Sequence, residues 1–209
     1  MVHVKICGVR TAEDARACVL LGASSIGVNF VRESPRHVDA STARAIAHAA
    51  HEANPKTVVV GVVANLSVEE MRALVREAGL DCLQLHGDES HETVAALLPH
   101  AYKAVRISTA ADVERARAVP GEYLLVDAKV DGALGGTGKA FDWSLVKELA
   151  RERKLTLAGG LDPDNVARAV RELDPYCVDV ASGVEWAGRP GEKDLAKVKA
   201  FIGAARSGG

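Results

Sequence analysis

Short apolar runs alternate with longer amphipathic segments along the whole chain. The runs are rich in Val, Ile and Leu, which is typical of strands buried on both faces of a parallel sheet. They predict eight strands, at Val2–Cys7, Ser25–Asn29, Thr57–Val63, Asp81–Leu85, Ala101–Arg106, Glu122–Asp127, Leu155–Ala158 and Cys177–Val180.

A segment with helical periodicity follows each run. Ser67 and Glu70 have the spacing of a capping box, and Asp162 precedes a proline that suits the first position of a helix. The predicted helices are Thr11–Leu21, Ser41–His51, Ser67–Ala78, Ser90–Leu98, Thr109–Ala118, Asp142–Arg153, Asp162–Leu173 and Lys193–Ala204.

This alternation predicts an α/β fold with a parallel sheet. Strand, helix and two loops together need about 25 residues, so eight units fill the 209 residues, either as a closed barrel or as an open doubly wound sheet. After the first strand, Gly8 is a single glycine where a dinucleotide-binding turn needs three. We therefore predict one (β/α)8 TIM barrel with eight parallel strands over residues 1–204, followed by a flexible C-terminal tail at residues 205–209.

Composition and charge narrow the function. Hydrophobic residues make up 48% of the chain and aromatic residues only 4%, so we expect a soluble protein with an aliphatic core. The net charge of −2, without a Lys/Arg block, argues against nucleic acid and anionic membranes as partners. We find no secretion signal, and the best apolar run, residues 57–64, is too short to span a bilayer. The four cysteines and seven histidines lack metal-binding spacing, so we expect a cytoplasmic protein without a metal.

Polar residues at strand ends are candidates for chemistry, because a barrel has its active site at the carboxyl ends of its strands. Cys7 and Asp127 end the first and sixth predicted strands, and their parity turns them inward together with Lys5 and Asp179. Lys5 on the same face would stabilise a Cys7 thiolate that is exposed to a ligand, and a carboxylic acid with a raised pKa at Asp127 would suit general-acid chemistry. The alternatives are a thiol that only packs and a carboxylate that caps a loop. We expect Lys5 and Asp179 to pair, since closure makes their strands neighbours.

Two glycine clusters predict a phosphate site. Gly159-Gly160 follows the seventh strand and Ser182-Gly183 the eighth, which are the loops where barrels commonly bind phosphate, and Asp162 and Ser182 are placed to open helices there. Arg36, after the second strand, is either a bidentate carboxylate ligand or a solvated loop arginine.

The segment Gly135–Ala140 looks like a nucleotide-binding loop, but Ala133 and Ala140 stand where that motif needs a glycine and a hydroxyl residue. We expect Ala128–Phe141 to be a mobile loop over the site, whose glycines add N–H groups to a bound ligand.

These segments together resemble the phosphoribosylanthranilate isomerases, small (β/α)8 enzymes of tryptophan biosynthesis. Two departures are visible: Ala64 replaces a bulkier apolar residue, and Ala181 replaces a serine, which leaves one hydroxyl fewer near the phosphate. The matching stretches are Lys5–Gly8, Ser34–Arg36, Gly61–Asn65, Leu83–Gly87, Leu125–Asp127, Gly135–Gly138, Phe141–Trp143, Leu157–Leu161 with Asn165, and Val178–Glu185.

The resemblance implies an Amadori rearrangement of N-(5-phosphoribosyl)anthranilate to 1-(o-carboxyphenylamino)-1-deoxyribulose 5-phosphate, without metal or cofactor. It implies that Cys7 is the general base, Asp127 the general acid and Arg36 the residue facing the anthranilate carboxylate. The expected partner is this small phosphorylated substrate, and the chain is expected to be a monomer or homodimer. Further residues expected to bind the substrate are His86, Gly138, Gly159, Gly160, Asp179, Ser182 and Gly183.

Two other readings remain open at this stage. A related phosphate-binding barrel, such as an indole-glycerol-phosphate synthase or a sugar-phosphate epimerase, would keep the late glycine loops but need a catalytic lysine at strand ends or metal-binding histidines. A non-catalytic binder of phosphorylated ligands would have no need for both Cys7 and Asp127.

Overall fold

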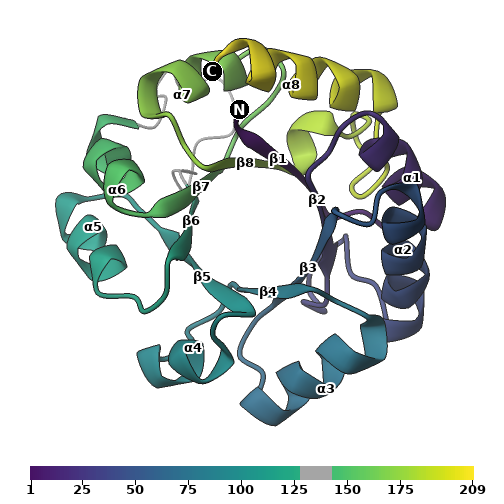
Figure 1. Cartoon of the computed structure of the whole chain (residues 1–209), viewed down its shortest axis with the longest axis horizontal. Helices are drawn as coiled ribbons and strands as arrows, with labels where there is room; N and C mark the ends of the chain where they lie inside the picture. Colours follow the sequence, from purple (N-terminus) through teal and green to yellow (C-terminus); the bar gives the residue numbers. More distant parts are fainter. Residues whose placement is uncertain (128–142) are drawn as a thin grey trace.

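Eight parallel strands close into a barrel in the computed structural model, which describes residues 1–127 and 143–209 (Figure 1). Each strand pairs with the next, and β1 pairs with β8 through Lys5 opposite Asp179. This closure confirms the predicted barrel and excludes the open sheet. The strands are β1 (His3–Cys7), β2 (Ser25–Asn29), β3 (Val58–Val63), β4 (Cys82–Leu85), β5 (Ala101–Arg106), β6 (Tyr123–Asp127), β7 (Lys154–Ala158) and β8 (Cys177–Val180).

Helices surround the barrel and cover the outer face of its strands (Figure 1). The capping box predicted at Ser67 and Glu70 is present at the start of α3, where each side chain accepts a hydrogen bond from the other residue's backbone. The helices are α1 (Ala12–Leu20), α2 (Ala40–Ala53), α3 (Val68–Ala78), α4 (His91–Leu97), α5 (Ala110–Arg117), α6 (Lys147–Glu152), α7 (Val166–Leu173) and α8 (Leu195–Ser207), with the 3-10 helices η1 (Trp143–Val146) and η2 (Ser182–Val184).

Two of the late helices begin later than the sequence predicts. The predicted start at Asp162 is wrong, because its carboxylate accepts the backbone N–H groups of Asp164 and Asn165 in a turn that precedes α7. Lys193 lies outside α8, which Asp194 caps. The predicted end of this helix at Ala204 is also wrong, since α8 continues to Ser207 and Ala205 is fully buried.

The sixth predicted helix, 142–153, is divided between η1 and α6, and its first residue lies outside the described residues. Val146 stands at the N-cap of α6, and its apolar side chain cannot accept a hydrogen bond from the backbone N–H groups of the first turn. The first turn, Trp143–Val146, is a 3-10 helix, a form that is common at helix ends.

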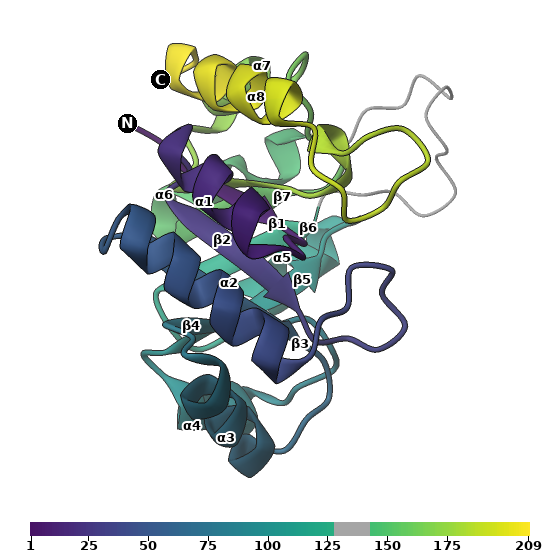
Figure 2. The ribbon, with the colours of Figure 1, turned by 90° about the vertical axis from the view of Figure 1, so that its right-hand side faces the viewer.

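The carboxyl ends of the strands lie on one side of the molecule. In Figure 2 the loop that follows β2 and the loop that leads into α8 project from the right-hand side, while both chain termini lie on the left. The loops that follow the strands therefore meet around one end of the barrel. Within the described residues, no helix has the length and apolar character needed to cross a membrane.

Candidate active site

A cavity of about 470 Å³ opens among the carboxyl ends of the strands. Most of the site residues predicted from their positions at strand ends therefore lie around one cavity. Gly183 is not among the lining residues, and Gly138 lies outside the described residues, as does the predicted loop Ala128–Phe141. The predicted residues that line the cavity are Cys7, Arg36, His86, Asp127, Gly159, Gly160, Asp179 and Ser182.

Cys7 ends β1 and is 9% exposed. A Cβ atom on Gly27 of β2 would lie 2.8 Å from the Cys7 Sγ, so the neighbouring strand needs a glycine to leave room for the thiol. Burial raises the pKa of the Cys7 thiol, and the opposing charges of Lys5 and Lys193 only partly offset that rise. Lys5 thus favours the thiolate, as the sequence predicted, but burial has the larger effect and leaves the pKa of Cys7 raised.

Lys5 is already engaged by a carboxylate, which explains its limited effect on Cys7. Its Nζ donates to Asp179 Oδ2 at 3.1 Å and to Gln84 Oε1 at 3.0 Å, which confirms the predicted pair inside the barrel. Burial, the largest single effect, lowers the pKa of Lys5, but the charge and hydrogen bond of Asp179 together with the charges of Cys7 and Tyr102 outweigh it and hold that pKa well above the usual value. The other oxygen, Asp179 Oδ1, is buried without a hydrogen-bond partner within the described part of the chain. Such an atom is suited to accept a hydrogen bond from a ligand.

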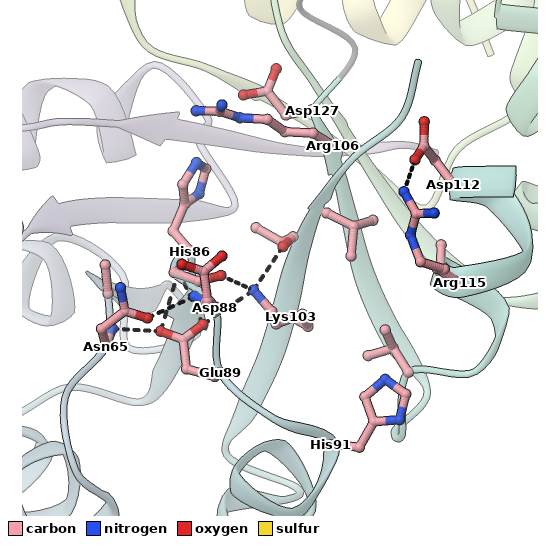
Figure 3. Close-up of a pocket in the computed structure, with 16 residues that line it drawn as sticks. Asn65, His86, Asp88, Glu89, His91, Lys103, Arg106, Asp112, Arg115 and Asp127 are labelled. Atoms are coloured by element: carbon pink, nitrogen blue, oxygen red, sulfur yellow. Dashed lines mark hydrogen bonds and ion pairs between the residues drawn. The ribbon is translucent and has the colours of Figure 1, made fainter. Parts of the chain in front are cut away.

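Asp127 and His86 lie between this cavity and a second one. Asp127 is the last residue of β6 and is half-buried, opposite Arg106 in the register of β5. The second cavity, of about 700 Å³, shares His86 and Asp127 with the first, and Figure 3 shows Asp127 beside Arg106 at its upper edge with His86 below them. An acid at Asp127 would therefore reach a ligand in either space.

His86 is held as a neutral imidazole. Burial lowers its pKa, and its Nδ1 lies 3.0 Å from the Gln84 Nε2 amide. A neutral ring that accepts the amide proton at Nδ1 carries its own proton on Nε2, an assignment made from this hydrogen bond. His86 can then act as a hydrogen-bond donor to a ligand.

Lys103 lines the second cavity but is used structurally. Its Nζ donates to the backbone carbonyl of Gly87 at 2.6 Å and pairs with Glu89 at 3.1 Å, as Figure 3 shows. The carbonyl groups of Leu85 and Ala104 also lie within hydrogen-bond distance of Nζ and share its third proton. This lysine holds the loop after β4 against β5.

Arg36 has a partner that neither sequence interpretation included. Its Nε and Nη2 donate to the two oxygens of Glu185, each at 2.7 Å, in a bidentate ion pair. Its stem packs on Gly8, where a Cβ would lie 2.3 Å from the Arg36 Cδ and where φ is +73°. The interpretation as a solvated arginine is therefore wrong. Guanidinium has five N–H groups, so several remain for a ligand in the cavity.

The two glycine loops pack against each other. Gly159 and Gly160 turn with φ of +92° and +69°, which favours glycine at both positions. A Cβ on Gly183 would lie 2.1 Å from the carbonyl oxygen of Leu161, so this residue allows close contact between the loops rather than lining the cavity. Ser182 opens η2 as predicted.

Sequence reasoning missed the role of Glu185 and Lys193. Both are buried, and they form an ion pair of 2.9 Å next to Arg36. The pair spans a loop without periodicity, so its only sequence signal is the two opposite charges. Among the residues that the structure describes, no group of acidic, histidine or cysteine side chains could hold a metal ion.

Comparison with known proteins gives a consistent result. The family model of N-(5'phosphoribosyl)anthranilate (PRA) isomerase matches residues 4–204. The N-(5'-phosphoribosyl)anthranilate isomerase of Pseudomonas aeruginosa (strain LESB58) is 46% identical over 209 residues, covering 99% of this chain and 96% of the relative. The enzyme of that name from Myxococcus xanthus is 44% identical, with coverage of 99% and 97%.

Solved structures agree over the whole length. Phosphoribosyl anthranilate isomerase from Thermotoga maritima superposes with a TM-score of 0.88 at 39% identity, covering 99% of both chains. A structure of a phosphoribosyl anthranilate isomerase in complex with reduced 1-(o-carboxyphenylamino)-1-deoxyribulose 5-phosphate gives 0.85 at 36% identity, again with 99% coverage of both. A third, at 35% identity with a TM-score of 0.83 and 99% coverage of both chains, is of monomers generated from the dimeric Thermotoga maritima protein.

Proposed function

The chain belongs to the N-(5'-phosphoribosyl)anthranilate isomerase family, and from this premise we propose that Cys7 and Asp127 catalyse the isomerisation as general base and general acid. The chain is thus an isomerase that converts N-(5'-phosphoribosyl)anthranilate to 1-(o-carboxyphenylamino)-1-deoxyribulose 5-phosphate in tryptophan biosynthesis. The observation that carries the assignment of roles is that Cys7 and Asp127 line the same cavity from β1 and β6. Arg36 and both glycine loops face that cavity as well.

The reaction needs one proton given and one removed. Asp127 donates a proton to the ring oxygen of the ribose, the bond from that oxygen to C1 breaks, and the nitrogen lone pair forms a protonated Schiff base. The Cys7 thiolate then removes the proton from C2, and the electrons of that bond form an enol-amine. The enol loses its hydroxyl proton while C1 gains one, which yields the ketone. No electrons enter or leave, so the step is an internal rearrangement.

Two anchors orient the substrate across the cavity. The phosphate lies against the backbone of Gly159, Gly160 and Ser182, with Gly183 providing the close contact between those loops. Arg36 directs N–H groups that Glu185 does not use to the anthranilate carboxylate. The ribose then extends between the anchors, next to Cys7.

Two further groups bind the ribose in this proposal. Asp179 Oδ1, buried and without a partner among the described residues, accepts a hydrogen bond from a ribose hydroxyl. His86, neutral because burial lowers its pKa, donates from Nε2. The role of Gly138, a cytoplasmic location and a monomeric or homodimeric state stay predictions from the sequence. Size-exclusion chromatography with light scattering would measure the last of these.

Turnover of N-(5'-phosphoribosyl)anthranilate, followed by the loss of anthranilate fluorescence, tests the proposed roles. The wild-type chain turns over the substrate. Cys7→Ala and Asp127→Asn lower kcat at least about 100-fold, the smallest contribution usual for general acid–base catalysis, with less effect on KM. Cys18→Ala is the matched control, because Cys18 is a buried thiol on α1 outside the cavity.

Three results would contradict the proposal. Near-wild-type kcat in Cys7→Ala removes the base, and the same result in Asp127→Asn removes the acid. Binding of the substrate by the wild-type chain without turnover indicates a non-catalytic binder. Circular dichroism of each variant separates loss of chemistry from loss of fold.

A further inference from the structure

A buried lysine lies behind the proposed site, in the loop between η2 and α8. The Lys193 side chain is 0% exposed. An antiparallel bridge between Glu185 and Lys193 fixes the backbone at both ends of the loop, and the Asp194 N–H donates to the Val184 carbonyl at 2.9 Å. The ammonium group is therefore held in one place by its own chain segment.

The three donors of Lys193 connect three parts of the site. Its Nζ donates to the backbone carbonyl of Cys7 at 2.7 Å, to the carbonyl of Ala181 at 3.3 Å and to Glu185 Oε1 at 2.9 Å. Cys7 is the proposed base, and Ala181 directly precedes Ser182, which lies in the proposed phosphate site. An ammonium group has three protons, so these contacts use all of them.

Glu185 extends this connection to the carboxylate anchor. Its carboxylate is 4% exposed and receives two bonds from Arg36 as well as the bond from Lys193. Burial raises the pKa of Glu185, but Arg36 and Lys193 outweigh that effect and hold it below the usual value. One buried anion therefore links two cations that serve different parts of the site.

We propose that Lys193 is a positioning residue for the isomerisation, whose buried ammonium group holds the backbone of Cys7 and, through Glu185, the guanidinium of Arg36 in one fixed arrangement. The inference rests on the proposed function, because it assumes that Cys7 is the base and Arg36 an anchor. Lys193 does not itself touch the substrate.

The charged groups around Cys7 indicate that Lys193 also affects the ionisation of the Cys7 thiol. Lys5 and Asp179 face it inside the barrel, Lys193 faces it from the loop before α8, and Arg36 from the loop after β2. Lys5 and Asp179 offset each other as an ion pair, and Glu185 offsets one of the other two cations. One positive charge remains uncompensated, and it favours the thiolate over the thiol.

Lys193→Met tests the proposal without leaving a buried charge unpaired. The variant keeps the apolar stem, and Glu185 keeps its bidentate bond to Arg36, so the chain retains one anion for one cation. Lys199→Met is the matched control, since it removes an exposed lysine from α8. Glu185→Gln provides a comparison that loosens Arg36 while Lys193 keeps its bond to Cys7.

Two measurements distinguish positioning from a purely structural role. Iodoacetamide alkylation of Cys7, followed by mass spectrometry of the tryptic peptide Ile6–Arg10, reports the thiolate without any substrate. In Lys193→Met we expect the rate at pH 7 to fall about tenfold, as for a rise of one pKa unit in the thiol. Turnover should show a lower kcat in Lys193→Met, whereas Glu185→Gln should mainly raise KM.

The outcomes separate this inference from the proposed function. An unchanged alkylation profile and unchanged kcat in Lys193→Met overturn the positioning role, as does a lower melting temperature with wild-type kinetics. If Lys193→Met and Lys199→Met shift the alkylation profile equally, the charge effect is not specific to Lys193. If the wild-type chain fails to turn over N-(5'-phosphoribosyl)anthranilate, the proposed function fails, while the alkylation comparison still tests the contact between Lys193 and Cys7.

Discussion

At Cys7, burial and charge act in opposite directions on one thiol. Burial favours the neutral form, and Lys5 and Lys193 favour the thiolate, with burial the larger effect. The other three cysteines do not line the active-site cavity, and Cys82 and Cys177 line a separate cavity toward the amino ends of the strands. Burial raises the pKa of Cys18 and Cys177 to about 12 and that of Cys82 to about 11. A base with a raised pKa is a strong proton acceptor once ionised, although only a small fraction is ionised near neutral pH.

The four cysteines should therefore differ in their alkylation by iodoacetamide. The thiolate is the reactive form, so the rate at Cys7 rises about tenfold per pH unit as long as the pH stays below its pKa, which is above the free-thiol value of about 8.5. Cys18, Cys82 and Cys177 remain unmodified up to pH 9, because their thiols stay protonated. Peptide mapping of the native chain from pH 6.5 to 9 measures all four at once. Equal rates at Cys7 and Cys18 at pH 8.5 would contradict the environment assigned to Cys7.

At the scale of elements, sequence patterns predict the strands better than the helix starts. The bounds of β2, β5 and β8 agree with the prediction, because runs of apolar residues end where side chains leave the barrel wall. The start of α7 was missed since the Asp162 side chain bonds to a local turn instead of capping the helix. From the local sequence alone, such an aspartate can either cap a helix or accept hydrogen bonds in a turn before it.

In the site, too, some features could be predicted from the sequence and others could not. The strand-end rule placed Cys7 and Asp127 in one cavity, since it follows from topology alone. The partners of Arg36 and Cys7 could not be predicted, because Glu185 lies 149 residues from Arg36 and Lys193 lies 186 residues from Cys7. Contacts at that separation leave no periodic signal in one sequence.

The glycine loop after β7 offers a test of the phosphate anchor. Gly160 lines the cavity, and a Cβ there would meet nothing within 4 Å, although its φ of +69° favours glycine, asparagine or aspartate. Gly160→Asn and Gly160→Asp then have similar backbone strain and shape, and only the second adds a negative charge. We expect KM for Gly160→Asp to be at least about tenfold above that of Gly160→Asn, through repulsion of the phosphate, and the difference to shrink with added salt.

Gly183→Asp would be a poor substitute, because its Cβ meets the Leu161 backbone and would move both loops. Titration with inorganic phosphate provides the substrate-free control for the Gly160 pair. Equal KM values in the two variants would place the phosphate elsewhere.

Across the whole molecule, a polar layer divides the barrel interior. Lys5, Gln84, Asp179 and Tyr102 meet there, with Tyr102 Oη donating to Gln84 Oε1 at 3.2 Å. The active-site cavity lies on one side of the layer, and a cavity of about 480 Å³ lined by Lys5 and Tyr102 lies on the other, toward the amino ends of the strands. The layer therefore closes the active site from below and supplies its unpaired acceptor, Asp179 Oδ1.

The Lys5–Asp179 bond also joins the first strand to the last, between residues 174 positions apart in the sequence. Its loss should therefore lower the free energy of unfolding. Lys5→Met leaves the Asp179 carboxylate buried without its cation, and we expect it to lower the free energy of unfolding by about 3–5 kcal/mol. Lys5→Met combined with Asp179→Asn removes both charges and should recover most of that loss, because an uncharged pair needs no counterion. Urea denaturation followed by circular dichroism measures the wild type, both single variants and the double variant as a cycle. If the double variant is as unstable as the sum of the two single variants, the ion pair contributes no coupling, and closure between β1 and β8 depends on their backbone hydrogen bonds and apolar packing alone.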